Sequence, residues 1–374
     1  MNIRQMINEQ RLVETFIRLA GLNSPSLEEE EIGRELVHML HVRGARVEVQ
    51  RFGQSFNVIA RKSGTVAGDR PLLLGAHMDT VEPTAGIQCI TAEGIIKTSG
   101  TTILGADNKS ALAQILETLT VLEERGLPHP PLEIVFTSAE EKGLLGARNL
   151  AVPLLLSRHC IILDISGPPG LIVTAAPARE QFNITVRGRA AHAGIEPEKG
   201  INAVRIAAEI IAALPNGRLD GETTFNVSSV GGGSSSNIVP KEATIHGEFR
   251  THSERRKAEL SECIRMTARA AAERFGAGVA VQIETEYEAF RIDSNHPFLA
   301  FAESVLRECN LVPRRIVTGG GSDANILNRH GICCLNLSNG MRDIHTTDEH
   351  IAVTDLVTGA EMLIRAACSF LSCR

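Results

Sequence analysis

The chain has 374 residues, of which 43% are hydrophobic and 22% charged, which is typical of a soluble globular protein but too long for one compact core. A formal net charge of −6, a single Tyr and no Trp argue against nucleic acid as the main partner, because a general basic field and aromatic stacking platforms are both missing. No apolar run near the N-terminus is long enough for a signal peptide or a membrane span, so we expect a cytoplasmic protein with no membrane partner.

The first half of the chain alternates helical patterns with apolar runs. Helices are expected at 10–20, 29–44 and 110–126, and strands at 45–52, 57–62, 71–79, 132–138 and 160–166. The last three strands are almost continuously apolar, as are strands buried on both faces of an α/β sheet. A further helix is expected to begin in LLGARNL, after the strand at 132–138. The eight cysteines form no CxxC pair, and we expect all of them to be reduced.

The pattern changes near residue 180, where strands become alternating and two amphipathic helices separate them. The order β-α-β-β-α-β predicts a four-stranded sheet with two helices. After residue 290 the α/β pattern returns through GICCLNLS and a final helix. We therefore predict a discontinuous catalytic domain at 1–179 and 290–374, with an inserted α+β domain at 180–289.

Carboxylates and histidines follow the predicted strands, at the edge of an α/β sheet where functional groups collect. They are His77, Asp79, Asp107, Glu140, Glu141, Asp164 and His345; of these, Asp107 is expected immediately before a helix and His345 just before the final helix. Each has an ordinary explanation as a helix cap, a complement to a helix dipole or a surface histidine. Their joint occurrence instead favours a pair of zinc-like ions, because imidazole and carboxylate both suit Zn²⁺.

Two ions held by so few ligands need one carboxylate between them, at a separation of about 3.5–4 Å. Asp79 lies two residues after His77 and can accept the second ring N–H of that histidine. One member of the pair Glu140–Glu141 is then left without a metal. It could take a proton from the attacking water and pass it to a leaving amine.

Seven blocks, in order and spread over essentially the whole chain, resemble the peptidase T-like branch of the di-zinc exopeptidase family. That family also contains dipeptidases, carboxypeptidase G and aminoacylases. The blocks are GAHMDTVEP, TTILGADNKSALAQILE, FTSAEEKGLLGARNL, LDISG, AAHAGIEPEKGINAV, SSNIVPKEATIHGEFR and GGGSDANIL. The resemblance implies an α/β catalytic domain, a mixed sheet flanked by helices, with an inserted lid through which a homodimer forms.

The resemblance also implies the metal ligands. His77 and Asp164 resemble the ligands of one zinc, Glu141 and His345 those of the other, and Asp107 the bridging ligand. It therefore implies two Zn²⁺ per subunit, although the sequence does not discriminate between Zn²⁺, Mn²⁺ and Co²⁺.

Three further positions are assigned by the same resemblance. Glu140 resembles the general base, and Asp79 the residue that orients the metal-binding histidine. The bridging residue is often joined to its successor by a cis peptide, and that successor is often an acid. Here it is Asn108, which is not a ligand, so we expect the departure to have little effect.

The inserted domain and the loop GGGSD contribute candidate substrate contacts. His192 resembles the histidine that polarises the scissile carbonyl oxygen, in many members from the partner subunit. Asn237 and Arg250 resemble substrate-binding residues, the arginine gripping the terminal carboxylate of the peptide. A surface ion pair with a neighbouring acid is the alternative for Arg250. Gly320 and Asp323 are expected to shape the substrate pocket.

The leading hypothesis is an aminopeptidase that removes the N-terminal residue from short peptides. An N-acyl amino acid amidohydrolase is the alternative, because both reactions attack an amide carbonyl with the same metal centre. The substrate pocket would discriminate: a peptidase needs an anion for the free α-amine, and an acylase an apolar pocket. A non-catalytic metal-binding protein is disfavoured, because the general base and all the metal ligands expected from the resemblance are present. A di-metal phosphoesterase is also disfavoured, because nothing beyond the metal ligands indicates one.

Overall fold

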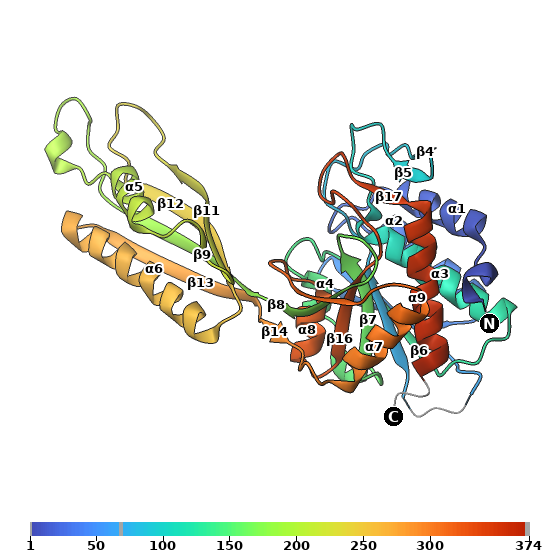
Figure 1. Cartoon of the computed structure of the whole chain (residues 1–374). Coiled ribbons are helices and arrows are strands. Elements are labelled where there is room, and N and C mark those ends of the chain that lie inside the picture. Colours follow the sequence, from blue (N-terminus) through green and yellow to red (C-terminus); the bar gives the residue numbers. More distant parts are fainter. Residues whose placement is uncertain (1, 67–69, 371–374) are drawn as a thin grey trace. The chain divides into compact units, whose positions relative to one another are not determined.

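The computed structural model describes residues 2–66 and 70–370, which divide into two units (Figure 1). The larger unit takes Met1–Thr174, Arg291–Val317 and Ser322–Arg374, and the smaller unit takes Ala175–Phe290 and Thr318–Gly321. The last segment lies outside the range expected for the insertion. Over the described ranges no helix is both long and apolar enough to cross a membrane. Cys373 lies outside those ranges, and the seven described cysteines are free thiols, as expected.

A mixed sheet forms the centre of the larger unit, in the order β1-β2-β6-β3-β7-β16-β8-β14, with β15 paired to β8. Its strands are β1 (Arg46–Phe52), β2 (Ser55–Lys62), β3 (Leu72–His77), β6 (Leu132–Thr137), β7 (His159–Ile165), β8 (Leu171–Ala176), β14 (Phe290–Arg291), β15 (Arg314–Val317) and β16 (Cys333–Ser338). The strands β6, β3, β7 and β16 are parallel, whereas β2 and β8 join this group antiparallel. Every residue of β3 and β6 is buried, which explains their continuous apolar sequences.

Helices cover this sheet. They are η1 (Ile3–Met6), α1 (Glu9–Ala20), α2 (Glu30–Val42), α3 (Ala106–Glu124), α4 (Leu145–Arg148), η2 (Val152–Leu154), α7 (Pro297–Glu308), α8 (Asp323–Arg329) and α9 (Val353–Ser369). Helix α3 packs on β3 and β7 and is in turn covered by α1 and α9, so it is buried on nearly all sides (Figure 1). Its buried position fixes the residues at its N-terminus relative to the strand ends. A small sheet, in the order β17 (His350–Ala352), β5 (Ile95–Lys97) and β4 (Ile90–Ala92), completes the unit.

The smaller unit is an antiparallel sheet with helices on one face. The sheet runs β10-β11-β12-β9-β13, and its elements are β9 (Ala178–Arg187), η3 (Pro197–Lys199), α5 (Ala203–Ala213), β10 (Gly217–Asp220), β11 (Thr223–Gly232), β12 (Glu242–Thr251), α6 (Glu254–Phe275) and β13 (Gly278–Tyr287). Alternate residues such as Phe182, Ile184 and Val186 face α5 and α6 and form the core. The expected four-stranded sheet is wrong by one strand, because the short β10 pairs with β11 at the edge.

Candidate metal centre

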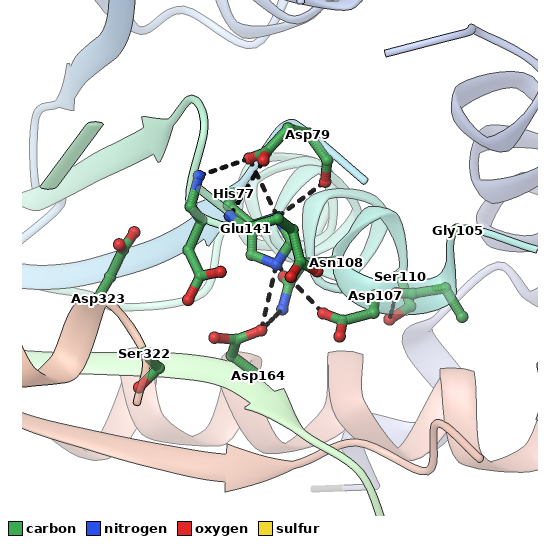
Figure 2. A network of polar contacts seen from close by, with 12 residues as sticks. His77, Asp79, Gly105, Asp107, Asn108, Ser110, Glu141, Asp164, Ser322 and Asp323 are labelled. Atoms are coloured by element: carbon green, nitrogen blue, oxygen red, sulfur yellow. Dashed lines mark hydrogen bonds and ion pairs between the residues drawn. The ribbon is translucent and has the colours of Figure 1, made fainter. Parts of the chain in front are cut away.

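The strand ends of the larger unit bring the predicted residues together because three neighbouring strands are parallel and in register. His77 is the last residue of β3 and pairs with Thr137 at the end of β6, while Gly75 pairs with Ile162 of β7. The side chains that follow these strands therefore meet at one edge of the sheet. Figure 2 shows His77, Asp107, Asn108, Glu141 and Asp164 converging there.

Asp107 lies between two histidines. It sits in the first turn of α3 with non-helical backbone angles, and its peptide bond to Asn108 is cis, as the family resemblance implies. Its Oδ1 is 3.2 Å from Nε2 of His77, and its Oδ2 is 3.3 Å from Nε2 of His345. One carboxylate thus presents a separate oxygen to each imidazole, which is the arrangement that a bridging ligand needs.

A second carboxylate accompanies each histidine. Oδ1 of Asp164 is 3.4 Å from Nε2 of His77, and Oε1 of Glu141 is 2.8 Å from Nε2 of His345. Donor atoms of His77, Asp107 and Glu141 all lie within 4.8 Å of one another. The structure therefore brings together the five side chains predicted as ligands. His345 reaches the group from a loop before β17, rather than from immediately before the final helix.

The tautomer of His77 suits a metal ligand. Its Nδ1 lies 2.8 Å from the backbone carbonyl oxygen of Asp79, so this nitrogen carries the proton and donates it. Nε2, the nitrogen left for coordination, faces the carboxylates of Asp107 and Asp164. The expected partner of this ring N–H was the Asp79 carboxylate, whose Oδ1 is farther away, at 3.5 Å. A fixed Nδ1–H tautomer is how proteins hold a histidine for coordination through Nε2.

The electrostatics of the cluster favour positive charge. Hydrogen bonds to Asp107 and Glu141 raise the pKa of His345 to about 10. Burial and the neighbouring Asp107 charge raise the pKa of Asp164 to about 7, although its contact with His77 opposes the shift. Burial also acts to raise the pKa of Asp107, but hydrogen bonds to His345 and His77 outweigh it and lower that pKa. A cation that binds here would displace these protons.

The Asp79 carboxylate holds the turn that carries Glu140 and Glu141. It is fully buried and accepts hydrogen bonds from the backbone N–H of Glu140 at 2.9 Å, from that of Glu141 at 3.2 Å, and from the Ser26 hydroxyl at 2.6 Å. Asp79 therefore fixes His77 through its carbonyl oxygen and the two glutamates through its carboxylate. The second contact has no signature in the sequence around His77.

Glu140 and Glu141 have different environments although they are adjacent. Glu141 contacts His345, whereas Glu140 has neither imidazole as a hydrogen-bond partner in the described chain. Burial and the charge of Asp164 raise the pKa of Glu140 well above its usual range, which suits a group that holds a proton. The preceding Ala139 has a φ of 48°, and its N–H donates to Glu29 at 2.8 Å. Sequence reasoning missed Glu29, which lies within a run of four glutamates.

Asn108 contacts a predicted ligand. Its side-chain amide donates to the Asp164 carboxylate and, at 2.9 Å, to the carbonyl oxygen of Leu163. An aspartate at this position could not donate these hydrogen bonds when ionised. The departure from the family pattern therefore has a structural role that the sequence did not indicate.

Asp323 begins α8 and lies beside the end of β6. Its Oδ2 accepts a hydrogen bond from the Thr137 hydroxyl, while its Oδ1 has no hydrogen-bond partner within the described chain. Burial raises the pKa of Asp323 to about 6. Figure 2 shows its carboxyl group on the side of the cluster away from Asp107.

The predicted residues of the smaller unit form two groups. His192 and Asn237 lie on adjoining exposed loops, where the N–H of Ala193 donates to the Asn237 carbonyl at 2.9 Å. Arg250 lies on β12 and donates from Nε to Glu248 at 3.0 Å, so it makes the ion pair considered as its alternative role.

Arg250 is also close to the segment Thr318–Gly321. Its Nη1 donates to the carbonyl oxygen of Gly319 at 3.3 Å, next to Gly320. Gly320 in turn donates its N–H to the Thr318 hydroxyl at 3.1 Å. The structure thus places Arg250 beside the glycine segment that contains Gly320.

Family models match two parts of the chain: the peptidase dimerisation domain of M20 peptidases matches residues 180–275, and peptidase family M28 matches residues 57–187. The chain is 36% identical to YqjE of Bacillus subtilis over 96% of this chain and 98% of YqjE. It is 27% identical to peptidase T of Shigella boydii, over 74% of this chain and 68% of the relative.

Two solved structures of peptidases are similar to this chain in both sequence and fold. Aminopeptidase PepT from Bacillus cereus has a TM-score of 0.88 and 34% identity, covering 98% of this chain and all of the other. A tripeptidase from Staphylococcus aureus has a TM-score of 0.91 and 33% identity, covering 97% and 98%. The chain belongs to the peptidase T-like branch of the M20 peptidases, and it is a peptidase.

Proposed function

We propose that this peptidase is a metal-dependent aminopeptidase that removes the N-terminal residue from short peptides, with two Zn²⁺ ions per subunit. The observation that carries the proposal is the position of Asp107, whose two carboxylate oxygens each face a different imidazole. The names of the Bacillus cereus aminopeptidase and the Staphylococcus aureus tripeptidase support short peptides as the substrate class.

The side chains present fit two zinc-like ions. Nε2 of His77 and Asp164 would hold one ion, Nε2 of His345 and Glu141 the other, and Asp107 would bridge them. Imidazole nitrogens and carboxylate oxygens are ligands that Zn²⁺ accepts, as do Mn²⁺ and Co²⁺. When bound, such ions polarise the substrate carbonyl and lower the pKa of the attacking water.

Glu140 is the proposed general base. It takes the proton that the attacking water gives up and delivers it to the nitrogen of the leaving amine, so the carboxylate is regenerated at the end of the reaction. The turn that carries Glu140 is fixed by Asp79 through the Glu140 N–H and by Glu29 through the Ala139 N–H. These contacts fix the backbone of the turn from which the Glu140 side chain extends.

The smaller unit contributes the remaining proposed roles. His192 is the proposed donor to the carbonyl oxygen that becomes negative during the attack. Arg250 is the proposed contact for the C-terminal carboxylate of the peptide, and Asn237 and Gly320 are proposed to position the peptide. The matched dimerisation domain supports a homodimer formed through this unit.

The test compares three substrates of the zinc-loaded protein: an unmodified tripeptide, the same tripeptide acetylated at its N-terminus, and an N-acetyl amino acid. We expect release of the N-terminal residue from the first and no turnover of the other two. Turnover of the N-acetyl amino acid alone would assign the chain to the acylases instead. Turnover of none, with both ions bound, would refute the proposed substrate class.

A further inference from the structure

Glu349 is a buried carboxylate that lies four residues after His345, in the loop before β17. Its Oε2 accepts hydrogen bonds from the backbone N–H groups of Leu104 at 2.8 Å and Gly105 at 2.7 Å. Its Oε1 accepts from the N–H of Asp107 at 2.9 Å. Both oxygens are therefore used on the backbone that leads into α3, and only 1% of the residue's surface is exposed.

The chain before α3 is shaped around this carboxylate. Gly105 has a φ of 72°, a left-handed conformation that favours glycine, and its N–H donates to the same oxygen as that of Leu104. Figure 2 shows Gly105 and Asp107 together at the start of the helix.

The loop that carries His345 and Glu349 thus contacts Asp107 at two points. His345 approaches Oδ2 of Asp107 at 3.3 Å, and Glu349 of the same loop holds the backbone N–H of Asp107 at 2.9 Å. The hydrogen bond to the backbone fixes where the Asp107 Cα lies, and the imidazole contact then depends on that position. A shift of this Cα would move both bridging oxygens relative to His77 and His345.

We propose that Glu349 is a positioning residue for the metal centre: it sets the location of the bridging carboxylate of Asp107 through the backbone of Leu104–Asp107. The inference rests on the proposed metal-dependent function. Glu349 touches neither His77 nor His345 among the contacts of the described chain, so it acts on the ions only through Asp107. Mutating a group that holds a metal ligand in place in this way typically lowers the metal affinity by about 10- to 100-fold.

Glu349→Gln is the sharpest variant because it keeps the shape and removes one acceptor. The remaining oxygen serves the Leu104 and Gly105 pair best, which leaves the new NH₂ group facing the N–H of Asp107. The new NH₂ group and the N–H of Asp107 are then two donors facing each other, with no acceptor between them. Glu349→Asp keeps both oxygens but is shorter by one methylene, so we expect it to restore part of the loss.

Glu133→Gln is the matched control. Glu133 is also 1% exposed and accepts from two consecutive backbone N–H groups, those of Leu156 at 3.0 Å and Ser157 at 2.8 Å. It lies near the start of β6, the opposite end of the strand from the metal centre. The control therefore reproduces the loss of a buried backbone acceptor without touching Asp107, and it also removes the charge that pairs with Arg61 at 3.1 Å.

The measurement is a Co²⁺ titration of the full-length protein, followed by calorimetry and by the visible absorption of bound Co²⁺, with thermal unfolding of each cation-free variant. We expect Glu349→Gln to lose about 10- to 100-fold in affinity for at least one ion and to alter the Co²⁺ spectrum. Glu133→Gln should lose stability alone, and Glu349→Asp should lie between wild type and Glu349→Gln.

Two results would overturn the inference, and they differ in what they say about the proposed function. If wild type binds two ions and Glu349→Gln binds them equally, with an unchanged spectrum, Glu349 is structural and the metal centre stands. If wild type binds no divalent cation, the metal centre itself is wrong and the role of Glu349 is lost with it. If Glu349→Gln does not fold, Glu349→Asp decides between these cases by the same titration.

Discussion

Gly146→Ala should disable the enzyme by adding one methyl group behind the turn that carries Glu140 and Glu141. A Cβ built on Gly146 would lie 2.3 Å from the carbonyl oxygen and 2.7 Å from the nitrogen of Ser138, both backbone atoms. Real Cβ atoms essentially never approach closer than 3.0 Å, so 3.0 − 2.3 gives a displacement of at least 0.7 Å. The Ser138 backbone is also tied to Gly146 by an N–H···O bond of 2.9 Å, so the strain cannot relax without moving the turn.

The size of the effect follows from that displacement. Overpacking of this kind costs about 1–3 kcal/mol of folding free energy. A catalytic group misplaced by about 1 Å loses about 100-fold in rate. Since Glu140 is two residues after Ser138, we expect kcat/KM for a tripeptide to fall by about 10- to 100-fold, or about 1.4–2.7 kcal/mol of barrier.

The assay is tripeptide turnover by the zinc-loaded variant, with urea unfolding of the same preparation. Gly221→Ala is the control, because a Cβ there meets no atom within 4 Å, and it should behave like wild type in both measurements. The reasoning is refuted if Gly146→Ala retains wild-type turnover and an unchanged unfolding midpoint. That result would mean that the turn adapts to the methyl group without moving Glu140.

Three further substitutions test individual roles. Glu140→Gln should keep its bound ions and lose about 10²- to 10⁴-fold in kcat; metal analysis that finds the ions gone from a folded variant would show that the roles of the two glutamates are exchanged. Arg250→Ala should raise KM for peptides with a free C-terminus, while Glu248 keeps Arg179 as a partner; an equal loss on C-terminally amidated peptides would remove the carboxylate-binding role. Asn108→Ala should weaken Co²⁺ binding by about tenfold or more, because it removes the amide that donates to the Asp164 carboxylate; unchanged binding would show that the Asn108 amide is dispensable.

The fold was predictable where burial leaves a strong pattern. The apolar runs at 71–79 and 132–138 indicated strands buried on both faces, and β3 and β6 are buried at every residue. The short β10 could not be found in this way, because the four residues GRLD are too few to show a period and are mostly exposed. The helix expected to begin in LLGARNL is only the four-residue α4, which ends at Arg148.

The segment Thr318–Gly321 shows a different limit. Its glycines carry no periodicity, and its assignment to the smaller unit depends on contacts with distant residues. A Cβ on Gly321 would lie 2.3 Å from the ring of Tyr287, so the backbone of the segment packs directly on that side chain. Only the folded chain reveals such a contact, because β14, α7 and β15 lie between Tyr287 and Gly321 in the sequence.

The candidate site divides in the same way. His77, Glu141 and Asp164 could be predicted from their places after strands, because the parallel register of the sheet brings strand ends together. The buried carboxylates that hold the backbone of the site could not be predicted from the sequence. Glu29 and Glu349 act by accepting backbone N–H groups of distant loops, and nothing in their local sequence distinguishes them from exposed glutamates.

The pairing of β8 with β14 has a consequence for how the smaller unit can vary during evolution. These strands lie at the two ends of Ala175–Phe290, the main segment of the smaller unit. They are neighbours in the sheet of the larger unit, where the Ile292 N–H donates to the Thr174 carbonyl at 2.8 Å. The main segment of the smaller unit therefore begins and ends at two neighbouring strands of the larger unit's sheet. The insertion's core comes from its own residues between Phe182 and Ile283. Such a module can be lengthened, replaced or diversified during evolution while the larger unit keeps its sheet and the geometry of its strand ends.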